Sequence, residues 1–308
     1  MMNTHAIEIK NLNKTYKGDK KSGPKVALNN VSLNIPKGSV FGLLGPNGAG
    51  KSTIINILAG LVTKTSGNVK IWDIDIDKDM RNAKSAIGIV PQEINMDPFF
   101  PPQDVLDIQA GLYGVPQSER RTAEILEMVG LSDKATARAR SLSGGMKRRL
   151  MVAKAMVHNP PILVLDEPSA GVDVELRKQL WDNIKTLNKQ GVTIILTTHY
   201  LEEAEEMCDR IAIINHGEII ACEDKELLSR IEGKEIRFRL DRPFENIPPG
   251  LDQFCAEKSG ERSLIIRYNP AEHSVEAMIT VIQKSDLKIA DITTSESNLE
   301  DVFLQLTS

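Results

Sequence analysis

The pattern of hydrophobic and polar residues divides the chain into a strand-rich segment, a helical segment and a further strand-rich segment. Nearly unbroken apolar runs predict buried parallel strands, because a strand covered on both faces of a sheet is apolar at almost every position. Segments with alternating character predict half-buried strands. The strands predicted in this way are Ala6–Lys10, Val31–Ile35, Val40–Leu44, residues 68–76, Ile87–Val90, Ile162–Leu165, Val192–Leu196 and Arg210–Ile214.

Helical periodicity replaces the strand pattern between about Gln92 and His158. Apolar residues recur there at helical spacing, which predicts helices at Val105–Tyr113, Glu119–Val129 and Met146–Val157. Because apolar strands precede and follow this segment, we expect residues 93–158 to form a helical subdomain inserted into a sheet-based domain.

A second module is expected after about Glu226. Its βαβ-like pattern predicts strands and helices at Glu235–Leu240, Ser263–Tyr268, Glu272–Lys284, Leu287–Thr294 and Asn298–Leu306, the third and the last being helical. The module carries no recognisable catalytic motif. The sequence therefore predicts two domains, residues 1–228 and residues 229–308, of which the second is a small α+β accessory domain.

Composition and charge restrict the classes of function. The 308-residue chain has a formal net charge of −4 and no block of five or more like charges, so no nucleic-acid partner is expected. Cys208, Cys222 and Cys255 form no CxxC pair, which argues against a disulfide framework or zinc site and for a reducing compartment. No signal peptide and no apolar run of roughly 18–20 residues is present. We expect a cytoplasmic protein that needs a second polypeptide for any membrane process.

A glycine-rich segment fills the pattern G-x-x-x-x-G-K-[ST] between a predicted strand and a predicted helix. Glycines allow a tight turn, so that several N–H groups and the start of the helix point at one phosphate. Lys51 would reach the β- and γ-phosphates, Ser52 would ligate Mg²⁺ and Thr53 would bond the α-phosphate. The alternative is an ordinary glycine-rich turn with a chance lysine. The residues predicted to bind a nucleoside triphosphate are Gly45, Pro46, Asn47, Gly48, Ala49, Gly50, Lys51, Ser52 and Thr53.

Two carboxylates, Asp166 and Glu167, end the apolar strand Ile162–Leu165. Sheets of the α/β class bind ligands at the carboxyl ends of their strands. We expect Asp166 to hold Mg²⁺ through water and Glu167 to act as the general base toward the attacking water. Alternatively the two acids cap the following helix, but the complete phosphate loop favours the catalytic interpretation.

The segment Leu142–Met146, of sequence LSGGM, precedes a predicted helix. Ser143 is a candidate N-cap, and Gly144 and Gly145 expose backbone amides that can bind an anion. Alone, these residues indicate an ordinary helix cap. Together with the phosphate loop and the two carboxylates, they resemble ATP-binding cassette proteins, whose signature motif is LSGGQ. Met146 replaces the glutamine of that motif.

The resemblance covers about residues 6–222 and implies roles for four further residues. Tyr16 matches the aromatic that stacks on adenine, and Gln92 matches the Q-loop glutamine that senses Mg²⁺ and the attacking water. Asp173 lies in the D-loop, whose sequence SAGVD departs from the usual SALD, and His199 matches the switch histidine at the γ-phosphate. Without the family pattern, Tyr16 is a strand-edge tyrosine and His199 a strand-end histidine.

In that family the signature motif of one subunit completes the ATP site of another, so that two ATP molecules lie between two cassettes. The resemblance therefore implies an ATPase that forms a dimer, and a homodimer is expected. It also implies an α/β P-loop NTPase cassette with a RecA-like core, an antiparallel β subdomain and a helical subdomain. The catalytic residues would be Glu167, His199 and Gln92, the Mg²⁺ ligands Ser52, Gln92 and Asp166, and the residues binding ATP in trans Ser143, Gly144 and Gly145.

Within the family, four segments have the character of ABC-2 type exporters: residues 142–149, 169–173, 197–204 and 297–304. In that class a separate membrane permease docks a short helix beside the Q-loop. This implies docking at Glu93–Tyr113, with Phe99 and Phe100 as an apolar patch, on the cytoplasmic face of the membrane. Alternatively both phenylalanines pack inside the helical subdomain.

The alternative function is that of a regulatory, nucleic-acid-associated or ribosome-associated ABC ATPase. Cassette proteins of ribosomes carry two cassettes in one chain with a charged linker, and those of DNA repair carry long coiled coils between the two motifs. This sequence shows neither feature. A regulatory module without transport is left open by the sequence.

Overall fold

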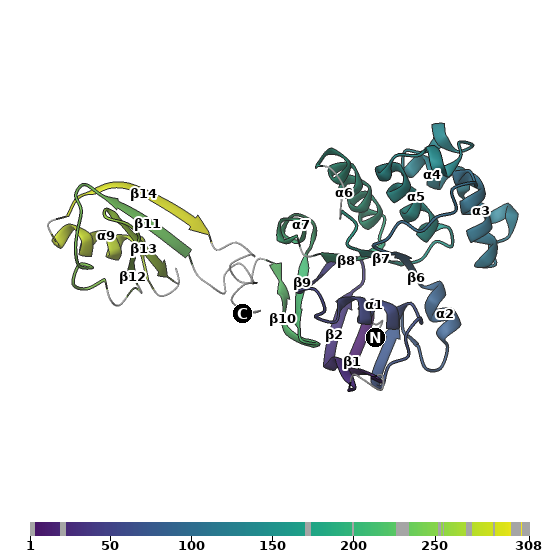
Figure 1. The fold of residues 1–308 in the computed structure, drawn as a ribbon, viewed down its shortest axis with the longest axis horizontal. Helices are drawn as coiled ribbons and strands as arrows, with labels where there is room; N and C mark the ends of the chain where they lie inside the picture. The colour runs from purple at the N-terminus through teal and green to yellow at the C-terminus, as the bar shows by residue number, and fades with distance from the viewer. Residues whose placement is uncertain are drawn as a thin grey trace. The chain divides into compact units, whose positions relative to one another are not determined.

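The computed structural model describes residues 4–18, 23–169, 174–198, 200–225, 234–251, 254, 256–268, 273–285, 287–296 and 303. The chain divides into two compact units, residues 1–223 and residues 224–308 (Figure 1). The sequence places the boundary a few residues later, at residue 228. The assignment of the two segments as a cassette and an accessory domain stays a prediction.

A six-stranded sheet forms the centre of the first unit, with the strand order β10-β9-β3-β8-β7-β6. Strands β9, β3, β8, β7 and β6 run parallel to one another. Strands β3 and β8 are buried at every position, as expected for strands covered on both faces. The bounds of the strands are β3 Val40–Leu44, β6 Ile87–Val90, β7 Ile162–Asp166, β8 Thr193–Thr198, β9 Arg210–Asn215 and β10 Glu218–Asp224.

The register of the parallel strands aligns their carboxyl ends. Leu44 pairs with Thr198, and Thr197 pairs with Asp166. Val90, the last residue of β6, pairs with Leu165. The loops that follow β3, β6, β7 and β8 therefore leave the sheet at the same end, which is the end where α/β proteins bind ligands.

A second, antiparallel sheet of the order β2-β1-β4-β5 accompanies the central sheet. Strands β1 and β2 are longer than predicted, because register shifts in their ladder interrupt the alternation of buried and exposed residues on which the prediction depends. The bounds are β1 His5–Tyr16, β2 Lys25–Pro36, β4 Ser66–Ile71 and β5 Ile74–Asp75.

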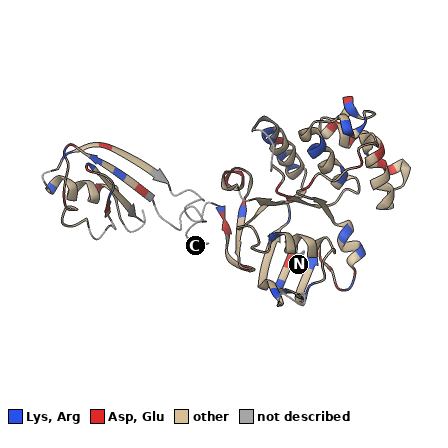
Figure 2. Cartoon of the chain, in the orientation of Figure 1, with Lys and Arg blue, Asp and Glu red and all other residues tan. Residues whose placement is uncertain are grey.

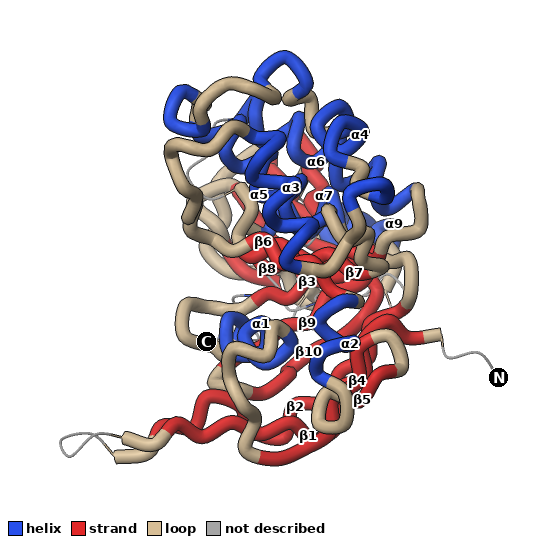
Figure 3. The backbone as a smooth tube through the Cα atoms, turned by 90° about the vertical axis from the view of Figure 1, so that its right-hand side faces the viewer, coloured by secondary structure: helices blue, strands red, loops and turns tan. Residues whose placement is uncertain are grey.

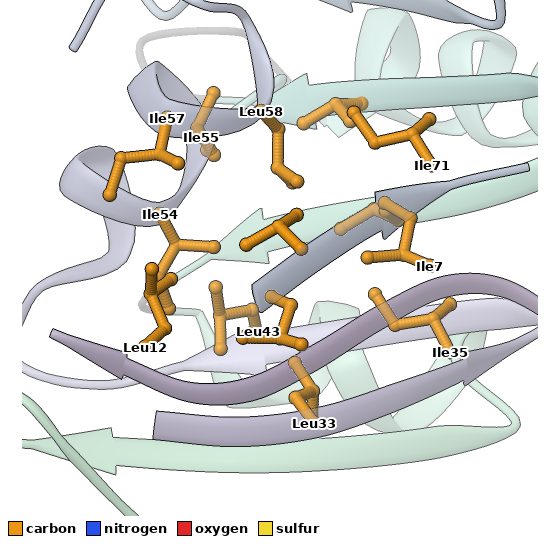
Figure 4. Close-up of a cluster of buried hydrophobic side chains, with 14 of the residues drawn as sticks. Ile7, Leu12, Leu33, Ile35, Leu43, Ile54, Ile55, Ile57, Leu58 and Ile71 are labelled. Atoms are coloured by element: carbon orange, nitrogen blue, oxygen red, sulfur yellow. The ribbon is translucent and has the colours of Figure 1, made fainter. Parts of the chain in front are cut away.

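Helix α1, Lys51–Leu58, lies between the two sheets (Figure 3). Its apolar side chains pack into one core with residues from both sheets. Figure 4 shows this contact, in which α1 meets side chains of β1, β2, β3 and β4; the labelled residues are Ile7, Leu12, Leu33, Ile35, Leu43, Ile54, Ile55, Ile57, Leu58 and Ile71. This packing fixes the first turn of α1 at the end of β3.

The other side of the central sheet carries helices α3, α4, α5 and α6 (Figures 1 and 3). The three helices predicted between residues 93 and 158 are confirmed as α3, α4 and α5, with ends that differ by a few residues. Helix α2 is not foreseen by the sequence pattern. The bounds are α2 Met80–Ser85, α3 Pro102–Leu112, α4 Thr122–Met128, α5 Gly144–Met156, α6 Val174–Lys189 and α7 Leu201–Met207.

The second unit is an antiparallel sheet of the order β12-β13-β11-β14 with helix α9. Strands β13 and β14 both pair antiparallel with β11, so they run parallel to each other and α9 connects them. The predicted βαβ-like pattern is thus present, with β11 inserted between its strands. The bounds are β11 Lys234–Leu240, β12 Ala256–Lys258, β13 Ser263–Tyr268, α9 Val275–Lys284 and β14 Ile289–Glu296.

Two further expectations concern the predicted C-terminal helix and membrane-spanning helices. The helix predicted at Asn298–Leu306 lies outside the described residues except for Phe303. In the part of the chain that the structure describes, no helix has both the length and the apolar character needed to cross a membrane.

Candidate functional site

The loop between β3 and α1 is shaped by two glycines that no other residue could replace without displacement of the backbone. A Cβ atom on Gly45 would lie 2.3 Å from the carbonyl oxygen of Ile214. Gly50 has a φ of 121°, and a Cβ atom there would lie 2.9 Å from the carbonyl oxygen of Ala27. No side chain caps α1, so the N–H groups of its first turn point out of the helix toward the loop.

Lys51 is the first residue of α1, and only 5% of it is exposed. Its Nζ donates hydrogen bonds to the carbonyl oxygens of Gly45 at 2.6 Å and Pro46 at 3.2 Å. Burial lowers the pKa of Lys51 below its ordinary value, and the negative charges of Glu167 and Asp166 act in the opposite direction. The ammonium group is therefore held over the loop, in the field of the two carboxylates.

Asp166 and Glu167 are held by Thr197, which lies beside them on β8. The Thr197 hydroxyl donates to Oδ1 of Asp166 at 2.5 Å. The backbone N–H of Glu167 donates to both the carbonyl oxygen and the hydroxyl oxygen of Thr197, at 3.0 and 3.2 Å. Glu167 has a φ of 46°, a left-handed conformation that is uncommon for a residue other than glycine. The neighbouring strand thus holds the turn that carries the two carboxylates.

Gln92 and Glu167 are brought together although they are 75 residues apart in sequence. Nε2 of Gln92 donates to Oε2 of Glu167 at 2.8 Å. Gln92 follows β6 and Glu167 follows β7, and these two strands are neighbours in the sheet. The predicted Q-loop glutamine therefore contacts the predicted general base directly.

A cavity of about 560 Å³ collects most of the predicted nucleotide-binding residues. This volume is in the range of small-molecule sites. Tyr16 lies at its edge, at the end of β1, and is 36% exposed. Lys25 and Ala27 of β2 also line the cavity, although the sequence gives no signal for them. The lining residues are Tyr16, Lys25, Ala27, Asn47, Gly48, Gly50, Lys51, Ser52, Thr53, Gln92 and Glu167.

The remaining predicted residues lie elsewhere. Gly45, Pro46 and Ala49 belong to the same loop but do not line the cavity. Ser143, Gly144 and Gly145 form the start of α5 and do not line it either; the Ser143 hydroxyl accepts a hydrogen bond from the backbone N–H of Met146 at 3.2 Å. Asp173 and His199 lie outside the described residues.

The oxygen donors of the site fit a magnesium ion. Among the described residues, no group of three or more His, Cys, Asp and Glu side chains could hold a metal alone. Mg²⁺ at phosphate sites needs only one or two protein oxygens, because phosphates and water supply the others. Ser52 and Gln92 line the cavity, and the Gln92 amide nitrogen bonds Glu167. Asp166 is not among the lining residues, but its carboxylate ends the neighbouring strand and is held by Thr197.

The comparisons with known proteins decide the family. The family described as ABC transporter matches residues 28–170. The linearmycin resistance ATP-binding protein LnrL of Bacillus subtilis is 37% identical over 98% of each chain. This chain belongs to the ABC transporter ATP-binding proteins. The Nod factor export ATP-binding protein I of Rhizobium etli is 35% identical to this ABC protein over 98% of this chain and 93% of its own.

Solved cassettes share the fold of this chain over about three quarters of its length. An ATP-binding cassette described as a dimer in a post-hydrolysis state with ADP and Pi has a TM-score of 0.62 and 30% identity, over 71% of this chain and 98% of its own. The cassette cbiO1 of Clostridium perfringens has a TM-score of 0.66 and 26% identity over 74% of this chain and 92% of its own. The predicted α/β P-loop cassette fold is confirmed. The chain is an ABC ATPase that binds and hydrolyses ATP.

Proposed function

We propose that this ABC ATPase is the ATP-hydrolysing subunit of an ABC-2 type exporter, which works as an ATP-sandwich dimer on a separate membrane permease. The observation that carries the proposal is the meeting of Lys51, Gln92 and Glu167 at one cavity. Two relatives matched over nearly the whole chain, the second unit included, are ATP-binding proteins of linearmycin resistance and of Nod factor export.

The geometry supports a division of work within the ATP site. Lys51 exchanges its bonds to the loop carbonyls for bonds to the β- and γ-phosphate oxygens, while the amides at the start of α1 bind the same phosphates. The Tyr16 ring offers a stacking surface for adenine. Gln92 orients the Glu167 carboxylate, which accepts a proton from the attacking water.

Ser52, Gln92 and Asp166 would hold Mg²⁺ beside the phosphates. When bound, the ion supplies positive charge that neutralises the phosphate oxygens. In the same proposal Asp173 and His199 keep the roles that the family resemblance implies, at the subunit contact and the γ-phosphate.

The position of the signature motif supports the dimer. Ser143 and Gly144 are exposed at the start of α5 and do not line the cavity that holds Lys51 and Glu167. Their amides and the Ser143 hydroxyl are thus available for a phosphate bound by a second copy of the chain. Gly145 lies one residue further into α5. In the proposed dimer, ATP itself joins the two subunits.

An apolar surface beside the Q-loop supports docking of a permease. Phe99 is 67% exposed, Phe100 44% and Leu112 77%, so the alternative that both phenylalanines pack inside the helical subdomain is wrong. A groove of about 640 Å³ is lined by three residues of the predicted docking segment, Asn95, Gln109 and Tyr113, and by Leu61, Ile89, Pro91 and Met151 among others; the two phenylalanines do not line it. A short helix of a membrane protein fits such a groove by its apolar face, which would hold the chain at the cytoplasmic face of the membrane.

Charge gives no support to a nucleic-acid or ribosome partner. Basic and acidic residues occur together on both units (Figure 2). The formal net charge of −4 is unfavourable for phosphate backbones. We therefore propose no nucleic-acid partner.

Affinity purification of the full-length chain from detergent-solubilised membranes tests the proposal. We expect a polytopic membrane protein to co-purify with the wild type. The double variant Phe99→Ser, Phe100→Ser should retain its thermal unfolding midpoint and lose the membrane protein, because both side chains are exposed. Ile220→Ser, which changes an apolar residue of β10 that is 41% exposed, is the matched control and should retain it. Recovery of ribosomes or DNA without a membrane protein would contradict the proposal.

A further inference from the structure

Arg148 is a charged residue buried behind the ATP site, and every N–H group of its side chain has an acceptor. It lies on α5 and is 3% exposed. Nε donates to the carbonyl oxygen of Pro168 at 2.8 Å. Nη1 donates to Pro91 at 2.7 Å and Gln92 at 2.9 Å. Nη2 donates to Glu167 at 2.7 Å and Asp166 at 3.2 Å, both at the backbone carbonyl.

The five acceptors belong to two short segments that carry the proposed catalytic side chains. Pro91 and Gln92 follow β6, and residues 166–168 end β7 and begin the next loop. The side chains of Gln92 and Glu167 hydrogen-bond each other at 2.8 Å. One planar guanidinium thus joins the backbones of the two residues whose side chains meet in the cavity. Only arginine has five donors in a rigid plane; the ammonium group of lysine has three donors at one point.

Negatively charged residues near Arg148 favour its protonated form. Burial lowers the pKa of Arg148 below its ordinary value, and the negative charges of Asp166 and Glu203 oppose that effect. Arginine stays protonated in proteins, so the guanidinium remains a donor to all five carbonyls. A charge in the protein interior is costly unless its hydrogen bonds are complete. The hydrogen bonds of Arg148 are complete, and all of their acceptors lie in the two segments at the ATP site.

We propose that Arg148 is a positioning residue for ATP hydrolysis, which fixes the turns after β6 and β7 so that Gln92 holds Glu167 in place. The inference rests on the proposed function, which assigns Glu167 to proton removal. Arg148 acts through these residues and touches no reacting atom. Its helix begins at Ser143 and Gly144, so the same helix also carries the motif proposed to contact ATP of a second subunit. A shift of α5 at the subunit contact would therefore move the backbone beneath Glu167.

The neighbouring Arg149 provides a matched control on the same helix. Its Nη1 donates to the carbonyl oxygens of Val129 and Gly130, at 2.8 and 3.0 Å, in the loop after α4. Arg149 thus makes the same kind of bond from the adjacent position of α5, but to a loop that does not line the ATP cavity. Removing either side chain removes hydrogen bonds to backbone carbonyls. Only the removal of the Arg148 side chain affects the turns that carry Gln92 and Glu167.

The experiment measures ATP affinity, kcat and the thermal unfolding midpoint of full-length Arg148→Gln, Arg148→Lys, Arg149→Gln and Glu167→Gln. We expect Arg148→Gln to keep ATP affinity within about threefold and to lose roughly 10–100-fold in kcat, since a small displacement of a catalytic group costs up to about 10²-fold. Arg148→Lys should lie between this variant and the wild type. Arg149→Gln should lower the unfolding midpoint and keep kcat at temperatures where it is folded.

The outcomes separate this inference from the proposed function. Wild-type turnover in Glu167→Gln would overturn the assignment of the base, and with it the positioning role of Arg148. Loss of turnover in Glu167→Gln, together with wild-type kcat in a folded Arg148→Lys or Arg148→Gln, would overturn only the positioning role. An equal loss of kcat in folded Arg148→Gln and Arg149→Gln would also overturn it. If Arg148→Gln does not fold, the kcat of Arg148→Lys decides, because this variant keeps the buried charge.

Discussion

At the scale of single residues, Thr197 shows how the central sheet supports the proposed chemistry. It is fully buried on β8, and its hydroxyl bonds both the Asp166 carboxylate and the backbone N–H of Glu167. Glu167 needs such support because its backbone is left-handed, a conformation that persists only where the surroundings hold it. Thr197 is not found by motif reasoning, since a threonine inside an apolar strand is an ordinary strand residue.

The substitution Thr197→Val tests this support. It removes the hydroxyl with little change of shape and leaves Asp166 short of one donor, so we expect a loss of about 1–3 kcal/mol in the free energy of unfolding and of roughly tenfold in ATP turnover. Thr193→Val is the matched control on the same strand, because the Thr193 hydroxyl accepts from the backbone N–H of Gly38 at 2.9 Å, at the other end of β8. The control should be destabilised similarly and keep its turnover. Equal turnover in both variants would contradict the role of Thr197.

At the scale of elements, the start of α5 has a different task from the start of α1. Lys51 and its neighbours at α1 face the cavity of their own chain, whereas Ser143 and Gly144 at α5 are exposed. Both helices offer free backbone amides, so sequence alone identifies each of them as an anion-binding candidate. The structure separates them, and this separation supports a site that is completed by another subunit.

The substitution Gly144→Ala tests that arrangement. A Cβ atom on Gly144 meets nothing within 4 Å, so the isolated subunit should fold with nearly unchanged stability. In the dimer the added methyl would stand where a phosphate approaches, and turnover should fall by at least about tenfold. In a Glu167→Gln background, gel filtration with ATP should show a dimer that Gly144→Ala weakens. Unchanged turnover and an unchanged ATP-dependent dimer would contradict contact in trans.

The elements also show why some parts of the fold were predictable. Strands β3, β6, β7 and β8 were placed within a residue or two, because burial on both faces leaves an apolar run with clear ends. Short elements such as β12 and α2 have too few residues to establish a period. The ladder between β1 and β2 contains register shifts. Buried and exposed residues therefore do not alternate regularly along these strands, and the sequence pattern predicted strands that were too short.

At the scale of the whole molecule, the residues of the candidate site that lie in sequence motifs could be predicted, and the others could not. The phosphate loop, Asp166 and Glu167 were found because each lies in a recognisable pattern next to a strand end, whereas Gln92 was found only through the family resemblance. The sheet register brings them together. Arg148 and Thr197 were not found, because their importance comes from burial and from partners distant in sequence. An arginine in a helix of mixed polarity is exposed far more often than buried.

At this scale the ATP site and a surface groove are lined by adjacent residues of the chain. Pro91 lines the groove, and the adjacent Gln92 bonds the Glu167 carboxylate. A permease helix in the groove would thus touch the segment that carries Gln92. In this account the membrane partner and the ATP site are connected through one short turn after β6.

The role of Glu167 as the general base is tested most directly by comparing wild-type protein with Glu167→Gln in ATP binding and in ATP turnover. The substitution keeps the shape of the side chain and removes its ability to accept a proton. We predict that ATP affinity stays within a few-fold of wild type and that kcat falls by roughly 10²–10⁴-fold, the usual contribution of a general base. A kcat equal to that of the wild type, measured in protein that binds ATP normally, would contradict the account.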